Sequence, residues 1–173
     1  MAAALAITAV PASAKNPMVG GAAMYPTKNI VENAVNSKDH TTLVAAVQAA
    51  GLVETLSGDG PFTVFAPTNA AFGKLPAGTV ETLVKPENKG TLTTVLTYHV
   101  VPGKITAGQI QSLAARNNGI AKLKTVQGEE LSFMKSGDRW MVHDAKGGSA
   151  FITIANVMQS NGVIHVIDTV LMP

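Results

Sequence analysis

The stretch Asn161-Gly162-Val163-Ile164-His165-Val166-Ile167-Asp168-Thr169-Val170-Leu171-Met172-Pro173 decides the fold of this chain. It opens with an Asn-Gly pair that is typical of a turn. It continues as a dense β-branched and apolar run that contains one histidine and one aspartate. β-Branched residues favour strands, and an apolar strand left unpaired would be a costly exposed edge. The run therefore predicts a strand that is paired inside the core.

A second segment, Thr63–Phe72, has the pattern of a strand followed directly by a short helix. Pro67 has no N–H to give to a strand ladder, so it should end the strand. Either Thr68 or Asn69 can then act as the N-cap, by accepting a hydrogen bond from the first turn of the helix. The sequence leaves open which of these two side chains is the cap.

Helix signals gather in the first half of the chain. Asn29, followed by Glu32 three residues later, has the pattern of a capping box. We expect Asp39 to cap a second helix and Gly51 to end it in the left-handed conformation. Pro86 suits the first turn of a further helix. These signals predict several short helices before the strand-rich part of the chain.

The second half of the chain changes to a period near two, which is typical of strands. Short turns that contain glycine separate the runs. The expected strands are Leu123–Val126, Glu130–Met134, Arg139–His143 and Phe151–Ile154. Helices followed by strands favour an α+β fold, in which an antiparallel or mixed sheet system carries the helices on one side.

Together these segments resemble a fasciclin domain. Thr63–Phe72 matches the first box of that family, Gly162–Pro173 matches the second, and Tyr98-His99 matches the family's Tyr-His pair. The resemblance covers about residues 29–173, which we expect to form a single domain. It implies a wedge or sandwich of two small packed β-sheets, with a layer of short helices from the N-terminal half.

The resemblance also implies a function, that of an extracellular or surface adhesion module. We expect a monomer that binds a protein or a glycan at a cell surface or in the matrix. In some animal matrix members an Asp just before the second box belongs to an integrin-contact segment, and Asn156 stands at that position here. An amide is a poorer metal ligand than a carboxylate, so integrin binding by this route is not expected. We expect partner contact at Tyr98, His99, Asn156, Val157 and Met158.

The N-terminus has the pattern of an export signal or its remnant, because no Lys or Arg precedes the apolar stretch. Residues 1–14 contain the apolar stretch Ala2–Val10, with small residues before a cleavage point after Ala14. The stretch is shorter than the roughly 20 apolar residues that a bilayer span needs. Residues 15–28 carry Pro and Gly without periodicity and are expected to form a flexible arm. These features predict a secreted, periplasmic or cell-surface protein with no membrane span.

Composition and motifs exclude several classes of protein. The net charge is +2 and charged residues make up 14% of the chain, so no Lys/Arg stripe offers the footprint that nucleic-acid binding requires. The absence of cysteine rules out disulfides and thiolate metal sites. Nucleophile-elbow, dinucleotide, P-loop and zinc-protease motifs are also missing from the sequence. No cofactor is expected.

The polar residues that could act chemically have simpler structural interpretations. Adjacent residues diverge from a helix or a strand, so the Tyr98-His99 pair should lock a helix-to-strand junction rather than exchange protons. His165 and Asp168 are three residues apart on a strand and should point to opposite faces. No catalytic residue is predicted. The residues with a predicted structural role are Thr68, Asn69, Tyr98, His99, His165 and Asp168.

Two possible metal-binding sites have little support in the sequence. His143-Asp144, with Asp138 across a predicted hairpin, offers fewer ligands than such sites usually need, and the same residues fit a turn. Three strand methionines could suggest a copper thioether cluster, although alternating strand positions favour core packing. These methionines are Met134, Met141 and Met158. No metal site is predicted.

Two alternatives to an adhesion module stay open. Aromatic residues make up only 5% of the chain, and the many Ala and Val residues allow a cavity in the core. A periplasmic carrier of a small hydrophobic or glycan ligand is therefore the first alternative. An unrecognised hydrolase is the second, and an esterase and glycosidase screen with a His99→Ala control would reveal it.

Overall fold

The structure is a computed structural model that describes residues 18–58, 60–76 and 78–172. The predicted export signal, residues 1–14, lies outside these ranges. The helical elements are α1 (Ile30–Ala34), η1 (Lys38–His40), α2 (Thr41–Ala50), α3 (Val53–Ser57), α4 (Asn69–Gly73), α5 (Thr79–Leu83), η2 (Pro86–Asn88), α6 (Lys89–Tyr98) and α7 (Ala107–Arg116). The strands are β1 (Met18–Val19), β2 (Ala22–Ala23), β3 (Phe62–Pro67), β4 (Val100–Pro102), β5 (Ile120–Lys124), β6 (Glu130–Ser136), β7 (Arg139–His143), β8 (Ser149–Gln159) and β9 (Gly162–Ile167).

Seven strands follow one another in the order β4-β3-β9-β8-β7-β6-β5, and β1 pairs with β2 in a separate hairpin. The β3–β9 pair is parallel and the other pairs are antiparallel. The long strand β8 belongs to both halves of the sheet, and its pairing with β9 shifts register between Ile152 and Val157. Such irregularities bend a strand and increase its twist. The two packed sheets predicted from the sequence are therefore two halves of one strand order, joined through β8.

Strands β3 and β9 are buried on both faces. Along β9, Ile164 and Val166 belong to one hydrophobic cluster, while Ile167 belongs to another. This explains the near-continuous apolar run of residues 163–167, because a parallel pair covered on both sides has no solvent face. A side chain at Gly162 would collide with the Phe62 carbonyl, so the start of the β3–β9 pairing requires glycine there. The prediction of a C-terminal strand paired in the core is confirmed.

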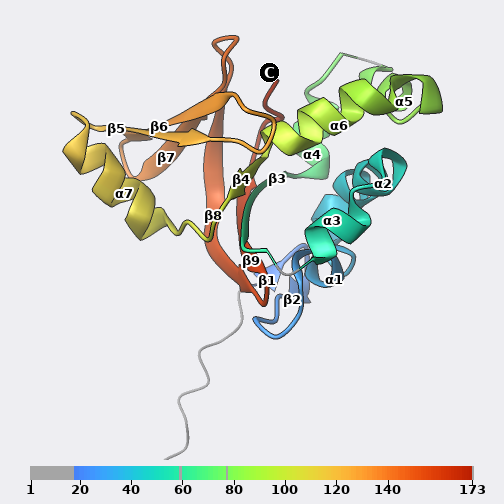
Figure 1. The fold of residues 1–173 in the computed structure, drawn as a ribbon, viewed down its shortest axis with the longest axis horizontal. Helices are drawn as coiled ribbons and strands as arrows, with labels where there is room; N and C mark the ends of the chain where they lie inside the picture. Colours follow the sequence, from blue (N-terminus) through green and yellow to red (C-terminus); the bar gives the residue numbers. More distant parts are fainter. Residues whose placement is uncertain (1–17, 59, 77, 173) are drawn as a thin grey trace, which may run out of the picture.

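Two cores result from this arrangement. We call the cluster between helices α1–α6 and the outer face of β3 and β9 the helical-layer core. The cluster between the two halves of the sheet, closed by α7, is the wedge core. In the wedge core, Phe65 of β3 and Phe133 of β6 have ring centroids 5.1 Å apart, although three strands separate β3 from β6 in the sheet. Figure 1 shows the helices on one side of the central strands and α7 with β5–β7 on the other. The α+β class is confirmed.

Most of the predicted helix ends are confirmed. The capping box of Asn29 and Glu32 starts α1, with both reciprocal bonds present. Gly51 ends α2 at φ 72°, and Pro86 opens η2 directly before α6. The prediction for Asp39 was wrong: Asp39 lies inside the 3₁₀ turn η1, and α2 starts after His40 without a side-chain cap.

The prediction of a flexible arm is wrong for residues 18–28. This segment forms the β1–β2 hairpin, and the side chains of Val19 and Met24 are 3% and 2% exposed in the helical-layer core. The carbonyl of Lys28 accepts a hydrogen bond from Ser160 N, which ties the segment to the β8–β9 turn. Its Pro and Gly residues mark turns rather than disorder.

Three helices were not anticipated from the sequence, namely α3, α5 and α7. The first two span only five residues each, which is too short for a periodic pattern to emerge. Among the described residues, no helix combines the length and the apolar character that a membrane crossing requires.

Candidate functional site

His99 joins the end of α6 to the C-terminal segment. Its Nδ1 donates to Val95 O over 2.8 Å, and Leu171 N donates to its Nε2 over 2.9 Å. The side chain is buried, and loss of hydration lowers its pKa to about 4. Both ring nitrogens are occupied by the backbone, so the neutral ring serves as a strut between two chain segments.

Tyr98, the residue before His99, points into the wedge core. Its ring belongs to the wedge core and its hydroxyl accepts a hydrogen bond of 2.9 Å from Ala145 N. Burial raises the pKa of the phenol. The rings of Tyr98 and His99 lie 6.3 Å apart at an interplanar angle of 88°. The pair therefore diverges into two cores, as adjacent residues at a helix end are expected to do.

His165 and Asp168 contact different partners. The Nε2 of His165 donates to Ile105 O over 2.8 Å, and its Nδ1 accepts from Asn156 N over 3.2 Å. Burial lowers the pKa of His165. Asp168 Oδ1 instead accepts from Phe151 N over 2.8 Å. In this geometry the two side chains do not form a catalytic dyad.

Asn156 stands at the irregular part of β8. It adopts φ 58°, in the left-handed region that Asn tolerates better than most residues. Its exposed side chain accepts a hydrogen bond of 2.8 Å from Ala107 N, at the first residue of α7. Its backbone N–H reaches His165 at the same time. Asn156 thus connects β8, β9 and α7, a role that the sequence analysis did not assign.

The structure corrects part of the predicted partner contact. Tyr98 and Val157 have 0% exposure and His99 has 3%, so none of these side chains can touch a partner directly. Asn156 is exposed and Met158 is partly buried, and these two can be reached from solvent.

The two candidate caps of α4 have separate roles. Thr68 is the cap, because its hydroxyl accepts from Ala71 N over 3.2 Å. Asn69 reaches back to the start of α2: its Oδ1 accepts from Thr42 N over 3.0 Å and its Nδ2 donates to Lys38 O over 2.8 Å. Asn69 therefore clamps α4 to η1 and α2, a long-range role that a local capping pattern cannot reveal.

Asp144 organises a turn. Its Oδ1 accepts from Lys146 N over 2.9 Å and from Gly148 N over 2.7 Å, and its Oδ2 accepts from Met172 N over 3.2 Å. In the part of the chain that the structure describes, no group of three or more His, Asp or Glu side chains is placed to hold a metal ion.

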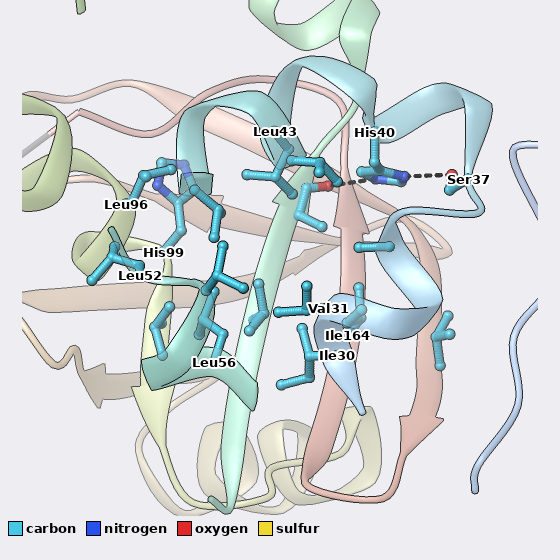
Figure 2. Close-up of a pocket in the computed structure, with 18 of the residues that line it drawn as sticks. Ile30, Val31, Ser37, His40, Leu43, Leu52, Leu56, Leu96, His99 and Ile164 are labelled. Atoms are coloured by element: carbon cyan, nitrogen blue, oxygen red, sulfur yellow. Dashed lines mark hydrogen bonds between the residues drawn. The ribbon is translucent and has the colours of Figure 1, made fainter. Parts of the chain in front are cut away.

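An apolar cavity of about 40 Å³ lies in the helical-layer core, beneath α1, α2 and α3 and against β3 and β9 (Figure 2). Ile30, Leu43 and Ile164 are among its aliphatic walls. By the same measure of volume, about 10–15 Å³ is enough for one water molecule, whereas an engineered cavity that binds benzene has about 150 Å³. The cavity as it stands can hold the tip of an apolar molecule but not a whole lipid.

His40 is the polar residue at one end of this cavity. Ser37 Oγ donates to its Nδ1 over 2.8 Å, while its Nε2 is 3.4 Å from Ala66 O (Figure 2). Burial lowers the pKa of His40. Sequence reasoning did not single out this residue, although the i, i+3 spacing of Ser37 and His40 was a signal for their contact.

Comparison with known proteins places this architecture in context. Residues 38–173 match the family model described as Fasciclin domain. Protein sll1483 of Synechocystis sp. is 51% identical over 160 residues, which cover 92% of this chain and 81% of that protein. The cell surface glycolipoprotein MPB83 of Mycobacterium bovis is 34% identical over 160 residues, covering 92% of this chain and 62% of that protein.

Among solved structures, a FAS1 domain pair from the insect cell adhesion molecule fasciclin I shares the fold. Its TM-score is 0.73 at 17% identity, and the match covers 84% of this chain and 51% of that one. The sequence boxes, the two-core wedge and the family match agree, and the chain belongs to the fasciclin domain family.

Proposed function

We propose that this protein is an exported, non-enzymatic binding module that mediates adhesion of cells to one another, to a surface or to a matrix. The family membership supports this proposal. So do the names of its relatives, because MPB83 is a cell surface glycolipoprotein and the insect protein of the same fold is a cell adhesion molecule.

The observation that carries the proposal is the state of the buried histidines. His99 and His165 each use both ring nitrogens in hydrogen bonds with the backbone. A general base needs a free nitrogen within reach of the proton that it removes. These two rings are committed to the architecture, so neither is a candidate general base, and the outer surface is the proposed site of action.

The surface around Asn156 and Met158 is the proposed partner contact. It lies on the irregular end of β8, beside the start of α7. A contact centred on two side chains is weak by itself, because stable interfaces bury about 1,600 Å² in total. Many copies on one cell surface would offset weak single contacts through avidity.

Gene deletion in the host tests the function. We expect the deletion strain to aggregate less and to attach less to surfaces, and the wild-type gene to restore both. A strain that carries Met158→Ser should attach less than one that carries Val126→Ser, a matched loss of an apolar side chain at an exposed site elsewhere. Unchanged attachment of the deletion strain across several substrates would refute the proposal.

A second candidate is a carrier of a hydrophobic ligand, and the observation behind it is the apolar cavity, which has room for the tip of such a molecule. Native mass spectrometry of protein purified from its host should then show a bound mass. Ala34→Leu on α1 would narrow the cavity and remove that mass, whereas Ala70→Leu on the exposed face of α4 would not. A spectrum that contains only the unliganded chain would count against the carrier.

A further inference from the structure

A second hollow lies on the other side of the molecule from the helical layer. It is a shallow concavity of about 260 Å³ where the β6–β7 turn adjoins β8. Its lining residues are Asp138, Arg139, Trp140, Ile152, Thr153 and Ala155. None of them lines the apolar cavity, so the two hollows are separate sites.

Trp140 forms the aromatic wall of this concavity. It is the only tryptophan of the chain. One part of its ring system packs against the wedge core, and the residue as a whole is partly exposed. Packing on one side fixes the orientation of the ring before any ligand arrives. A rigid aromatic side chain of this kind costs little entropy on binding and is typical of binding hot spots.

Polar groups surround the ring. The side chains of Asp138, Arg139 and Thr153 are exposed at the rim. The carboxylate can accept hydrogen bonds, the guanidinium can donate several, and the Thr hydroxyl can accept. Because one negative and one positive side chain line the concavity, it carries no net charge. This balance favours a ligand that is uncharged and rich in both donors and acceptors.

The size of the concavity limits the ligand further. Pockets for drug-sized molecules usually measure about 300–1,000 Å³, so this hollow fits a single ring-sized unit. A protein partner would need about 800 Å² of contact on this side and an apolar centre. The six residues that line this hollow form a patch much smaller than that. Ala155, the lining residue with the smallest side chain, takes little of this space.

We propose that this concavity binds one pyranose unit of an uncharged polysaccharide. A pyranose has a face of C–H groups and a rim of hydroxyls. The C–H face stacks on Trp140, and the hydroxyls bond to Asp138 and Arg139. The proposal rests on the proposed function, because it gives the adhesion module a glycan as its partner. It centres that contact on Trp140 of β7 and on the part of β8 before Asn156.

Saturation-transfer NMR with defined oligosaccharides tests the site on the purified chain. The probes are cellohexaose, mannohexaose and β-1,4-galactohexaose, with hexagalacturonate as the charged comparison. We expect at least one neutral hexaose to bind and to shift the fluorescence of Trp140, which reports on the site alone because it is the single tryptophan. Hexagalacturonate should bind no better than the neutral probes.

Variants assign the binding to the concavity. Trp140→Ala should weaken binding about tenfold or more, because it removes the side chain that we expect to contribute most of the binding energy. Trp140→Phe should keep part of the affinity because it retains an aromatic face. Tyr25→Ala removes an exposed aromatic ring that does not line the hollow and should leave binding unchanged. Thermal melting of each variant separates loss of binding from loss of fold.

Binding by none of the neutral probes, binding of the uronate alone, or equal binding by Trp140→Ala would overturn the glycan site. If no glycan binds but the deletion strain still loses attachment, the glycan site is refuted and the adhesion function is not. Retained glycan binding with normal attachment of the deletion strain would refute adhesion instead.

Discussion

The helical-layer core and the wedge core share β3 and β9 but are packed differently. In the wedge core, His165 has 0% exposure, bonds through both nitrogens and stacks on Phe65 with ring centroids 5.5 Å apart. In the helical-layer core, His40 has one close partner and a second at 3.4 Å, and it borders a cavity. The same side chain is therefore a tight strut in one core and a loose one in the other. The loosely packed layer is the part of the fold that can adapt.

Alanine substitution at the two histidines gives the largest expected effect. His165→Ala removes two hydrogen bonds and a stacked ring from a tight site and should cost about 3–5 kcal/mol. His40→Ala should cost about 1–2 kcal/mol, because one of its bonds is long and the site already borders free space. Urea unfolding would measure both. Equal losses would show that the two cores are packed alike.

Acid should destabilise the fold through the same buried rings. The pKa of His99 is about 4 in the folded state and about 6.5 in the unfolded chain. Above pH 6.5 both states are neutral at this site. Between pH 6.5 and 4 the unfolded chain takes up more protons, so stability falls as the pH is lowered. A shift of this size contributes about 3 kcal/mol to the free energy of unfolding at neutral pH. Nearly all of this contribution is lost by pH 4.

Unfolding by urea at several pH values checks this slope. His40 and His165 have lowered pKa values for the same reason and should add to the effect. A His99→Gln variant, which does not titrate, should be less stable at pH 7 but should lose less on acidification. A slope that is the same in this variant would assign the acid sensitivity to other groups.

The sequence allowed the centre of the fold to be predicted, but not its junctions. Strand β9 and the strand-to-helix turn at Thr68 were recognisable because local patterns determine them. The end of β8 was not, because Asn156 interrupts the alternation and its bonds reach α7 and β9. A periodic pattern cannot encode contacts between residues so distant along the chain.

The candidate sites were predictable to a smaller extent. The structural role expected of His165 agrees with its hydrogen bonds, whereas Tyr98, His99 and Val157 were expected at a surface and are buried. The exposure of a side chain depends on which other elements pack over it, and the local sequence pattern does not contain this tertiary information. Both hollows likewise arise from the packing of several elements, and no single segment indicates them.

Replacing one alanine in each core by valine would compare the packing of the two cores directly. Ala66 lies on β3 and lines the cavity, while Ala121 lies on β5 with 0% exposure in the wedge core. Ala121→Val should cost about 1–3 kcal/mol because the wedge core has no room for two methyl groups. Ala66→Val should change stability by less than about 1 kcal/mol, because the cavity accepts them. Thermal melting would decide, and a larger loss at Ala66 would mean that the cavity wall is rigid.

The smallest expected effect separates a local bond from a long-range one in the helical layer. Thr68→Ala and Asn69→Ala should each cost about 1 kcal/mol, so stability alone cannot distinguish them. Hydrogen exchange can: Thr68→Ala frees Ala71 N, while Asn69→Ala frees Thr42 N on α2. If α4 and α2 move as one unit, both variants will speed exchange at both amides. Faster exchange at Thr42 in the Asn69 variant alone would show that Asn69 is what holds the two helices together.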